Sequence, residues 1–208
     1  MILIGQYDSP FVRRVAIALR LYGISYVHRP WSTFGDAELI AQFNPLRRVP
    51  TLVLDSGEAL IESGAILDYL DESVGPSRAM MACNGESRRQ ALKVCALATG
   101  LADKAVSLVY ERVLHQSASD QWIARCLTQI GDVFGALERD RAGKATRFWF
   151  GETIGHADIA VACALRFTRE AHKALFDESR WPALASHASK CEALEAFGAV
   201  VQPFLPPS

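Results

Sequence analysis

Cysteine is absent from the first 82 residues of this 208-residue chain, and the five cysteines of the second part are widely spaced. None belongs to a C-x-x-C pair or has histidine partners at metal-ligand spacing, so neither a redox-active dithiol nor a metal site is expected. Disulfide exchange by the first part of the chain is disfavoured for the same reason. We expect buried, reduced thiols on helices at all five positions: Cys83, Cys95, Cys126, Cys163 and Cys191.

Long apolar runs are also missing, and the chain shows no signal peptide pattern. The sequence therefore predicts no membrane span and a cytoplasmic protein. The formal net charge is only -1, and the basic residues are scattered in pairs such as Arg13-Arg14, Arg47-Arg48 and Arg88-Arg89. Because no concentrated positive field results, a nucleic acid partner is not expected.

Strand and helix patterns alternate over residues 1–76, which we predict to form one domain. Apolar runs indicate four strands, at residues 2–4, 25–28, 51–54 and 59–61. Helical spacing of apolar residues indicates three helices, at residues 10–22, at residues 37–43 and after Ser63, which we assign as a helix cap. The first two strands should pair in parallel, because a helix connects them.

Helical periodicity dominates from about Glu86 onward, and no further strand is indicated. Residues 75–85 form the expected linker, and residues 85–208 the second domain. Four helices are predicted, at residues 86–115, 119–141, 155–172 and 182–197. Three prolines near the end predict a non-helical tail: Pro203, Pro206 and Pro207.

Ser9 and Pro10 stand where the first helix should begin. Proline suits the first helical position, which makes Ser9 the N-cap. A helix N-terminus carries partial positive charge and lowers the pKa of a nearby thiol. The pair is therefore either an ordinary cap or a site that holds the thiolate of a bound peptide.

Two further motifs have both a structural and a functional interpretation. In Arg48-Val49-Pro50, the proline is either an ordinary strand entry or a cis residue that turns the Val49 backbone toward an extended peptide ligand. In Glu62-Ser63, a carboxylate and a hydroxyl meet at a second helix start. That arrangement is common at helix caps, but it can also hold the ammonium and carboxylate groups of an amino acid.

The three motifs occur in this order on an α/β frame that is followed by helices. In this combination the chain resembles the cytosolic glutathione S-transferases. The resemblance covers essentially the whole chain, and the Ser9 segment is similar to the serine-type members, including the plant tau class and related bacterial proteins. It implies a thioredoxin-like α/β N-terminal domain that binds glutathione and an all-α C-terminal domain that contributes a hydrophobic substrate pocket. Glutathione would be the co-substrate, without a metal.

The resemblance also implies roles for individual residues in glutathione binding. The backbone of Val49, beside a cis-proline at Pro50, would pair with the cysteinyl unit, and Glu62-Ser63 would bind the γ-glutamyl end. Arg48 would meet the glycyl carboxylate, with Arg47 as the alternative.

Ser9 would donate its hydroxyl hydrogen to the glutathione sulfur. Tyr7 is a weaker candidate for this step, because it does not stand at the helix cap, and we expect it at the entrance of the substrate pocket. Phe11 and Tyr110 are further candidates for that pocket, although ordinary core packing explains them equally well.

The segment Gly151–Ile159 resembles the family's buried capping motif at the start of a core helix. Asp158 would reach back to the cap amide, and Ile154 and Ile159 would form a hydrophobic staple. Gly155 departs from the usual serine or threonine. We do not assign a catalytic role to His156 or His172, because neither has a nucleophile at workable spacing.

The leading hypothesis is a transferase, active in detoxification, that conjugates the glutathione thiolate to a small apolar electrophile. Glutathione-dependent isomerase, dehalogenase or peroxidase activity is an alternative at the same site. A third possibility is a non-enzymatic relative kept for ligand binding or protein interaction. A homodimer is expected from the family, and the sequence does not identify the electrophile.

Overall fold

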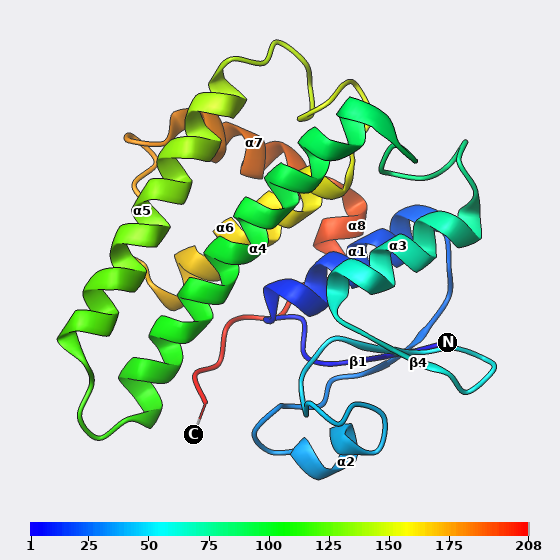
Figure 1. The fold of residues 1–208 in the computed structure, drawn as a ribbon, viewed down its shortest axis with the longest axis horizontal. Helices are drawn as coiled ribbons and strands as arrows, with labels where there is room; N and C mark the ends of the chain where they lie inside the picture. Colours follow the sequence, from blue (N-terminus) through cyan, green and yellow to red (C-terminus); the bar gives the residue numbers. More distant parts are fainter. Residues whose placement is uncertain (208) are drawn as a thin grey trace.

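The computed structural model describes residues 1–207 and shows an α/β part followed by a helical part (Figure 1). The first part contains β1 (Ile2–Ile4), α1 (Pro10–Tyr22), β2 (Val27–Arg29), α2 (Ala37–Ala41), β3 (Thr51–Val53), β4 (Ala59–Ile61) and α3 (Ser63–Val74). The second contains α4 (Gly85–Leu114), α5 (Asp120–Ala142), α6 (His156–Ala171), α7 (Pro182–Glu192) and α8 (Glu195–Gly198). The predicted fold class is confirmed, and the exact domain limits, 1–76 and 85–208, stay a prediction.

The four strands form one mixed sheet in the order β2-β1-β3-β4. β1 and β2 pair in parallel, as predicted from the helical crossover, and the other neighbours are antiparallel. Leu3 and Leu52 are register partners whose side chains pack with α1 and α3. Ile4 and Val53 belong to a separate cluster with Ile40 of α2. Successive side chains of a strand point to opposite faces of the sheet, so both faces carry apolar side chains that helices cover (Figure 1).

Two predicted element boundaries are wrong. The helix expected at residues 182–197 is interrupted at Leu194, whose extended backbone separates α7 from α8 while its side chain packs into the core. Ser63 is the first residue of α3 and not its cap, because Glu62 carries the non-helical backbone, with φ +66°. Gly23 ends α1 in the left-handed conformation, with φ +70°, which glycine adopts without steric cost.

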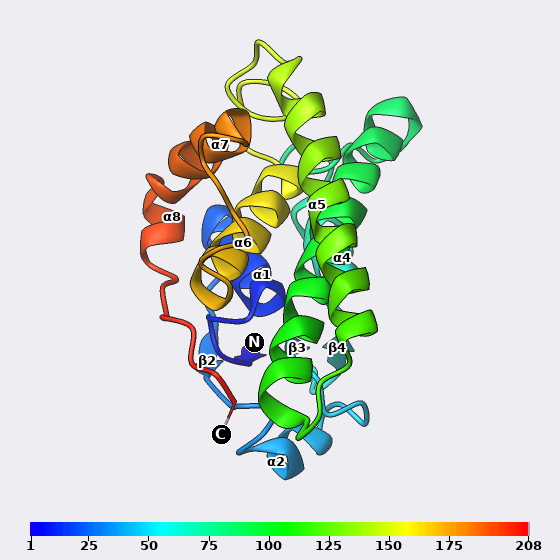
Figure 2. The same ribbon diagram turned by 90° about the vertical axis from the view of Figure 1, so that its left-hand side faces the viewer.

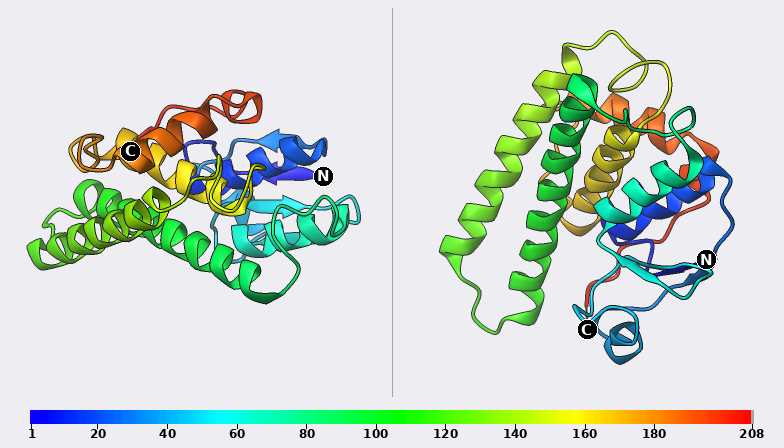
Figure 3. Two further views of the ribbon diagram at one scale, coloured as in Figure 1. Left: turned by 90° about the horizontal axis from the view of Figure 1, so that it is seen from above. Right: turned by 45° about the vertical axis from the view of Figure 1, so that its right-hand side comes forward.

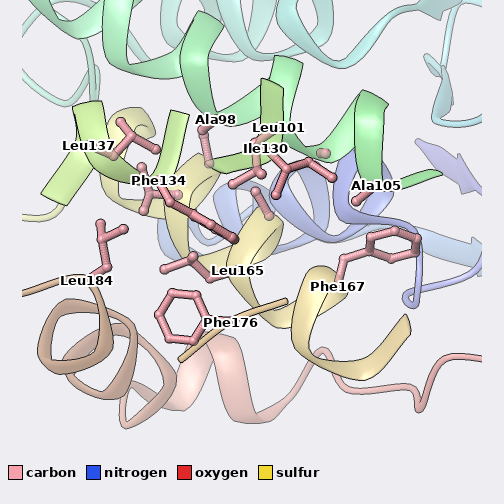
Figure 4. Close-up of a cluster of buried hydrophobic side chains, with 14 of the residues drawn as sticks. Ala98, Leu101, Ala105, Ile130, Phe134, Leu137, Leu165, Phe167, Phe176 and Leu184 are labelled. Atoms are coloured by element: carbon pink, nitrogen blue, oxygen red, sulfur yellow. The ribbon is translucent and has the colours of Figure 1, made fainter. Parts of the chain in front are cut away.

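The helical part is organised around α6. This helix packs against α1, α4 and α7, and α5 completes the bundle by packing against α4 and α7 (Figures 2 and 3). Twelve of the sixteen residues of α6 are buried, in agreement with its apolar run. Leu101 of α4, Phe134 of α5 and Leu165 of α6 meet in the core that Figure 4 shows. Burial of such side chains contributes about 1.5–3 kcal/mol each.

The capping motif at the start of α6 forms as predicted. Asp158 is 1% exposed, and its carboxylate accepts hydrogen bonds from the amides of Gly155 (2.8 Å) and Trp149 (2.7 Å). Ile154 and Ile159 belong to the same apolar cluster. A Cβ atom on Gly155 would lie 3.0 Å from the carbonyl oxygen of Met80, tighter than ordinary contacts. The approach of the linker therefore explains why glycine replaces serine or threonine.

A buried polar cluster connects the two parts of the chain. Asp71 of α3 accepts hydrogen bonds from the Tyr22 hydroxyl of α1 and the Met80 amide of the linker (3.3 Å), and it pairs with His156 Nε2 of α6 (2.8 Å). Burial alone would raise the pKa of Asp71, but the contacts of His156 and Tyr22 outweigh it and lower the pKa. His156 is therefore a structural residue, as is His172, whose Nε2 lies 2.8 Å from the Ala105 carbonyl oxygen.

Four of the five cysteines are buried, but Cys83 is exposed, because it lies in the linker and not on a helix. All five are free thiols, and burial raises the pKa of Cys163 to about 11.

Within residues 1–207, no helix is long and apolar enough to cross a membrane. The same residues contain no cluster of His, Cys, Asp and Glu that could hold a metal ion.

Candidate functional site

A hollow of about 730 Å³ lies between the two parts of the chain. The β1–α1 loop with the first residues of α1, the segment 31–35 and residues 47–49 line it from the α/β part. α4, α6 and the tail line it from the helical part. Of the residues predicted for the site, it brings together Ser9, Phe11, Arg47, Arg48, Val49 and Tyr110.

Ser9 is the N-cap of α1, as predicted. Its Oγ accepts a hydrogen bond from the Val12 amide (3.4 Å), and Pro10 occupies the first helical position. Among the described residues, none accepts the Ser9 hydroxyl hydrogen. The hydroxyl therefore has a hydrogen to donate into the hollow, at the end of α1 where the helix carries partial positive charge.

Tyr7 does not line the larger hollow, although its neighbours Gln6 and Asp8 do, and its predicted place at the entrance stays a prediction. Its ring stacks on His28 with centroids 3.8 Å apart, and its hydroxyl lies 2.8 Å from the Tyr26 hydroxyl. Burial, followed by the contact with Tyr26, raises the pKa of Tyr7. The hydroxyl of Tyr7 is thus engaged with Tyr26, and its ring with His28, inside the α/β part.

The apolar wall combines Tyr110, a predicted pocket residue, with Phe34, Phe167 and Phe204, which the sequence did not single out. Tyr110 of α4 packs edge to face on Phe34, with ring centroids 5.5 Å apart. Phe204 of the tail packs the same way on Phe167 of α6 at 5.4 Å. Both pairs line the hollow. Because each pair joins segments that are far apart in the sequence, no local sequence pattern predicts these contacts.

The C-terminal tail runs from the end of α8 toward the end of the molecule where α2 lies (Figure 2), and its residues 204–207 line the hollow. The Phe204 amide donates to Glu170 of α6 (2.8 Å), and the Leu205 amide donates to Asp8 (3.4 Å). Gln202 accepts from the Tyr7 amide (3.0 Å). Burial raises the pKa of Asp8, which lies directly before Ser9. The non-helical tail is thus fixed by hydrogen bonds and forms part of the wall.

Glu62 and Ser63 lie at a second, smaller hollow of about 370 Å³, which shares Phe11 with the first. Ser63 is 4% exposed, and its backbone opens α3. Glu62 has a positive φ, which is costly for a residue with a side chain and is found mainly at functional sites. Arg48 lies 3.6 Å from the Glu62 carboxylate, so two residues predicted to bind opposite ends of a peptide contact each other here.

Arg14 is a buried residue beside the candidate site that the sequence did not single out. It lines the smaller hollow, is only 6% exposed, and its Nε has no hydrogen-bond partner among the described residues. Burial lowers the pKa of Arg14, with a smaller opposing effect of Cys95 and Cys163. A buried cation beside the N-terminus of α3 makes this hollow favourable for a carboxylate.

Residues 47–49 line the larger hollow just before β3. The Val49-Pro50 bond is cis, the second of the two possibilities left open by the sequence. β3 begins at Thr51, so Val49 precedes the paired part of the strand. Arg47 also has a positive φ (+53°), and its guanidinium pairs with Glu38 of α2.

Comparison with known proteins agrees with this geometry. The family model of the glutathione S-transferase N-terminal domain matches residues 3–78, and that of the C-terminal domain matches residues 120–188. An uncharacterized GST-like protein of Escherichia coli strain K12, YibF, is 31% identical over 169 residues, which cover 80% of this chain and 81% of the relative. The chain belongs to the glutathione S-transferase family.

Solved structures of the family superpose on nearly the whole chain. A glutathione transferase family member from Pseudomonas fluorescens Pf-5, with bound glutathione, has a TM-score of 0.85 and 29% identity, covering 98% of this chain and 99% of that one. A glutathione S-transferase from Methylobacillus flagellatus KT, with GSH bound, has a TM-score of 0.87 and 26% identity, covering 96% and 98%. Both of these structures contain bound glutathione.

Proposed function

We propose that the chain conjugates glutathione, its co-substrate, to a small apolar electrophile at the larger hollow. The observation that carries this proposal is the free Ser9 hydroxyl at the start of α1, beside an apolar wall. A thiolate placed there receives a hydrogen bond from Ser9 and the favourable field of the helix end. The thiol proton leaves to solvent, and the wall holds the electrophile next to the thiolate. The thiolate attacks the electrophilic carbon, and either a leaving group such as halide departs with its electron pair or a carbon–carbon double bond opens and takes a proton from water.

Glutathione binding is proposed to span both hollows. The γ-glutamyl carboxylate would accept from Ser63 and the first amides of α3, with the charge of Arg14 nearby, while Glu62 would accept from the ammonium group. The cysteinyl unit would pair with the Val49 backbone, beside Pro50. This path is short, since Phe11 lines both hollows.

Arg48 is our candidate for the glycyl carboxylate. It is 60% exposed at the edge of the larger hollow, and its contact with Glu62 is loose enough to be exchanged for a ligand. Arg47 is the weaker candidate, because its guanidinium is already paired with Glu38.

Two measurements test this function. Calorimetry should show glutathione binding, and ultraviolet absorbance should show that the bound thiol is ionised near neutral pH, because the helix end and Ser9 favour the anion. A bound thiol that stays protonated at neutral pH would contradict the mechanism. Absence of binding at millimolar glutathione would favour the non-enzymatic alternative.

Analysis of the product separates the possible reactions. A conjugate supports the proposed transfer, whereas an isomer, a dehalogenated product or oxidised glutathione identifies one of the alternative activities.

A role in detoxification, a cytoplasmic location and a homodimer are proposed from the family alone. Sedimentation of the purified chain measures the last of these.

Phe204→Ala should raise KM for the apolar electrophile about 3- to 30-fold and leave KM for glutathione nearly unchanged. The ring lines only the larger hollow, and its loss removes apolar contact area from the proposed electrophile wall. Steady-state kinetics with each substrate varied in turn measure both constants. Leu184→Ala is a stability control, because Leu184 is fully buried and does not line that hollow. Equal changes in both KM values would contradict the assignment.

A further inference from the structure

Charged side chains are unevenly distributed around the larger hollow. Its two arginines, Arg47 and Arg48, come from the α/β part, on the side proposed for glutathione. Among the described residues, the helical part and the tail contribute one charged lining residue, Asp103, and the β1–α1 loop contributes Asp8. The wall proposed for the electrophile therefore carries carboxylates and, within residues 1–207, no cation.

Asp8 has no counter-charge in the part of the chain that the structure describes. It forms no ion pair, whereas Asp103 Oδ2 lies 3.0 Å from Lys104 Nζ. Glu170 of α6 acts on Asp8 with the same sign of charge, and Arg166 already pairs with Glu170 at 2.8 Å. A cation brought by a ligand would therefore supply the charge that Asp8 lacks.

Asp8 is held at the side of the hollow that the tail forms. Its Oδ2 accepts a hydrogen bond from the Leu205 amide (3.4 Å), where the tail passes the start of α1 (Figure 1). Burial raises the pKa of Asp8, and hydrogen bonds from the amides of Leu205 and Ser9 oppose this effect. A cation close to Asp8 would lower its pKa further and favour the carboxylate.

Aromatic rings accompany this carboxylate. Phe204 directly precedes Leu205, and its ring packs edge to face on Phe167 with centroids 5.4 Å apart. A second aromatic pair lines the same hollow. The faces of aromatic rings attract cations, so rings and carboxylate favour the same sign of charge on a ligand. An apolar body with one cationic group would use both, whereas an anionic electrophile would be repelled by Asp8.

We propose that the larger hollow prefers electrophiles with an apolar body and one cationic group, such as a protonated amine, and that Asp8 selects them. The inference rests on the proposed conjugation. In that reaction the glutathione thiolate forms the sulfur–carbon bond, and a leaving group such as chloride departs with its electron pair. The cationic group forms no covalent bond, so Asp8 determines specificity and is not a catalytic residue.

Three electrophiles of similar size test this preference. They are chloronitrobenzylamine, which is protonated at neutral pH, the uncharged chloronitrobenzyl alcohol and the anionic chloronitrobenzoate. kcat/KM for each is measured with the parent chain and with Asp8→Asn, whose side-chain carbonyl can still accept from Leu205. The ratio of kcat/KM for the amine to that for the alcohol should fall about tenfold in the variant, because one charge-assisted contact is lost. The ratio for the benzoate should rise.

Asp132→Asn is the matched control, because Asp132 is an exposed aspartate of α5 outside this hollow. It should keep the ratios of the parent chain. Equal ratios in the parent chain and Asp8→Asn would overturn the inference alone, as would an equal change in Asp132→Asn. Absence of a conjugate from all three electrophiles would overturn the proposed function and the inference with it. Thermal unfolding checks that the variants fold. If Asp8→Asn does not fold, Asp8→Ser takes its place, and the same outcomes apply to it.

Discussion

Ser9→Ala is expected to lower the rate of conjugation roughly 10- to 100-fold while glutathione still binds. The substitution removes the hydroxyl that would donate to the thiolate, and a hydrogen bond to a charged group contributes about 1.5–3 kcal/mol. The other groups proposed to bind glutathione lie elsewhere, at Val49 and at the start of α3. Turnover of chlorodinitrobenzene and the pH dependence of the bound thiolate absorbance measure the effect, and the apparent thiol pKa should rise.

Two controls separate chemistry from folding in this variant. Ser9 also caps α1, so Ser9→Ala should cost about 1 kcal/mol of unfolding free energy, which urea titration measures independently. Ser9→Thr keeps a hydroxyl and should recover much of the rate. Tyr7→Phe should retain the parental rate, because the Tyr7 hydroxyl contacts Tyr26 and not the hollow. Parental turnover by Ser9→Ala would refute the assignment.

Asp158→Ala should lower the free energy of unfolding by about 2–5 kcal/mol, more than the loss of about 1 kcal/mol expected for Ser9→Ala. It leaves two amides, those of Gly155 and Trp149, without their acceptor at the start of the central helix. Each buried donor left unsatisfied costs about 1–3 kcal/mol. Gly155 has no side chain that could replace the lost cap.

Urea unfolding of the parent chain and of Asp158→Ala measures this difference. Glu152→Ala is the matched control, since Glu152 is an exposed carboxylate of the same segment and should change stability by less than about 0.5 kcal/mol. Equal midpoints for the parent and Asp158→Ala would show that the motif does not stabilise α6.

The motifs found in the sequence depend on local geometry, which explains why they were predictable. A serine before a proline sets a helix cap from a few neighbouring residues, and the same holds for Asp158 three residues after Gly155. The order of strands and helices likewise followed from periodicity. The Glu62 backbone, by contrast, is set by the path of the chain into α3, so the cap was placed one residue too late.

The missed residues depend on contacts between distant segments. Arg13 and Arg14 were noted only as one of several scattered basic pairs, yet both are buried. Arg13 forms paired hydrogen bonds with Glu192 of α7 at 2.6 and 2.7 Å, and Arg14 faces the smaller hollow. The charge of an arginine does not reveal whether it is buried. Burial of its guanidinium is favourable only when the fold places a carboxylate or a ligand site beside it, and that partner can be distant in sequence.

The course of the last residues has a practical and an evolutionary consequence. Phe204 and Leu205 shape the larger hollow although they belong to no helix or strand, and they are only partly buried or exposed. Substitutions there can reshape ligand selectivity with little penalty for folding, which makes the carboxyl end a ready target for directed evolution. An affinity tag attached beyond Pro207 would begin at the larger hollow, because Pro206 and Pro207 line it, whereas Met1 does not.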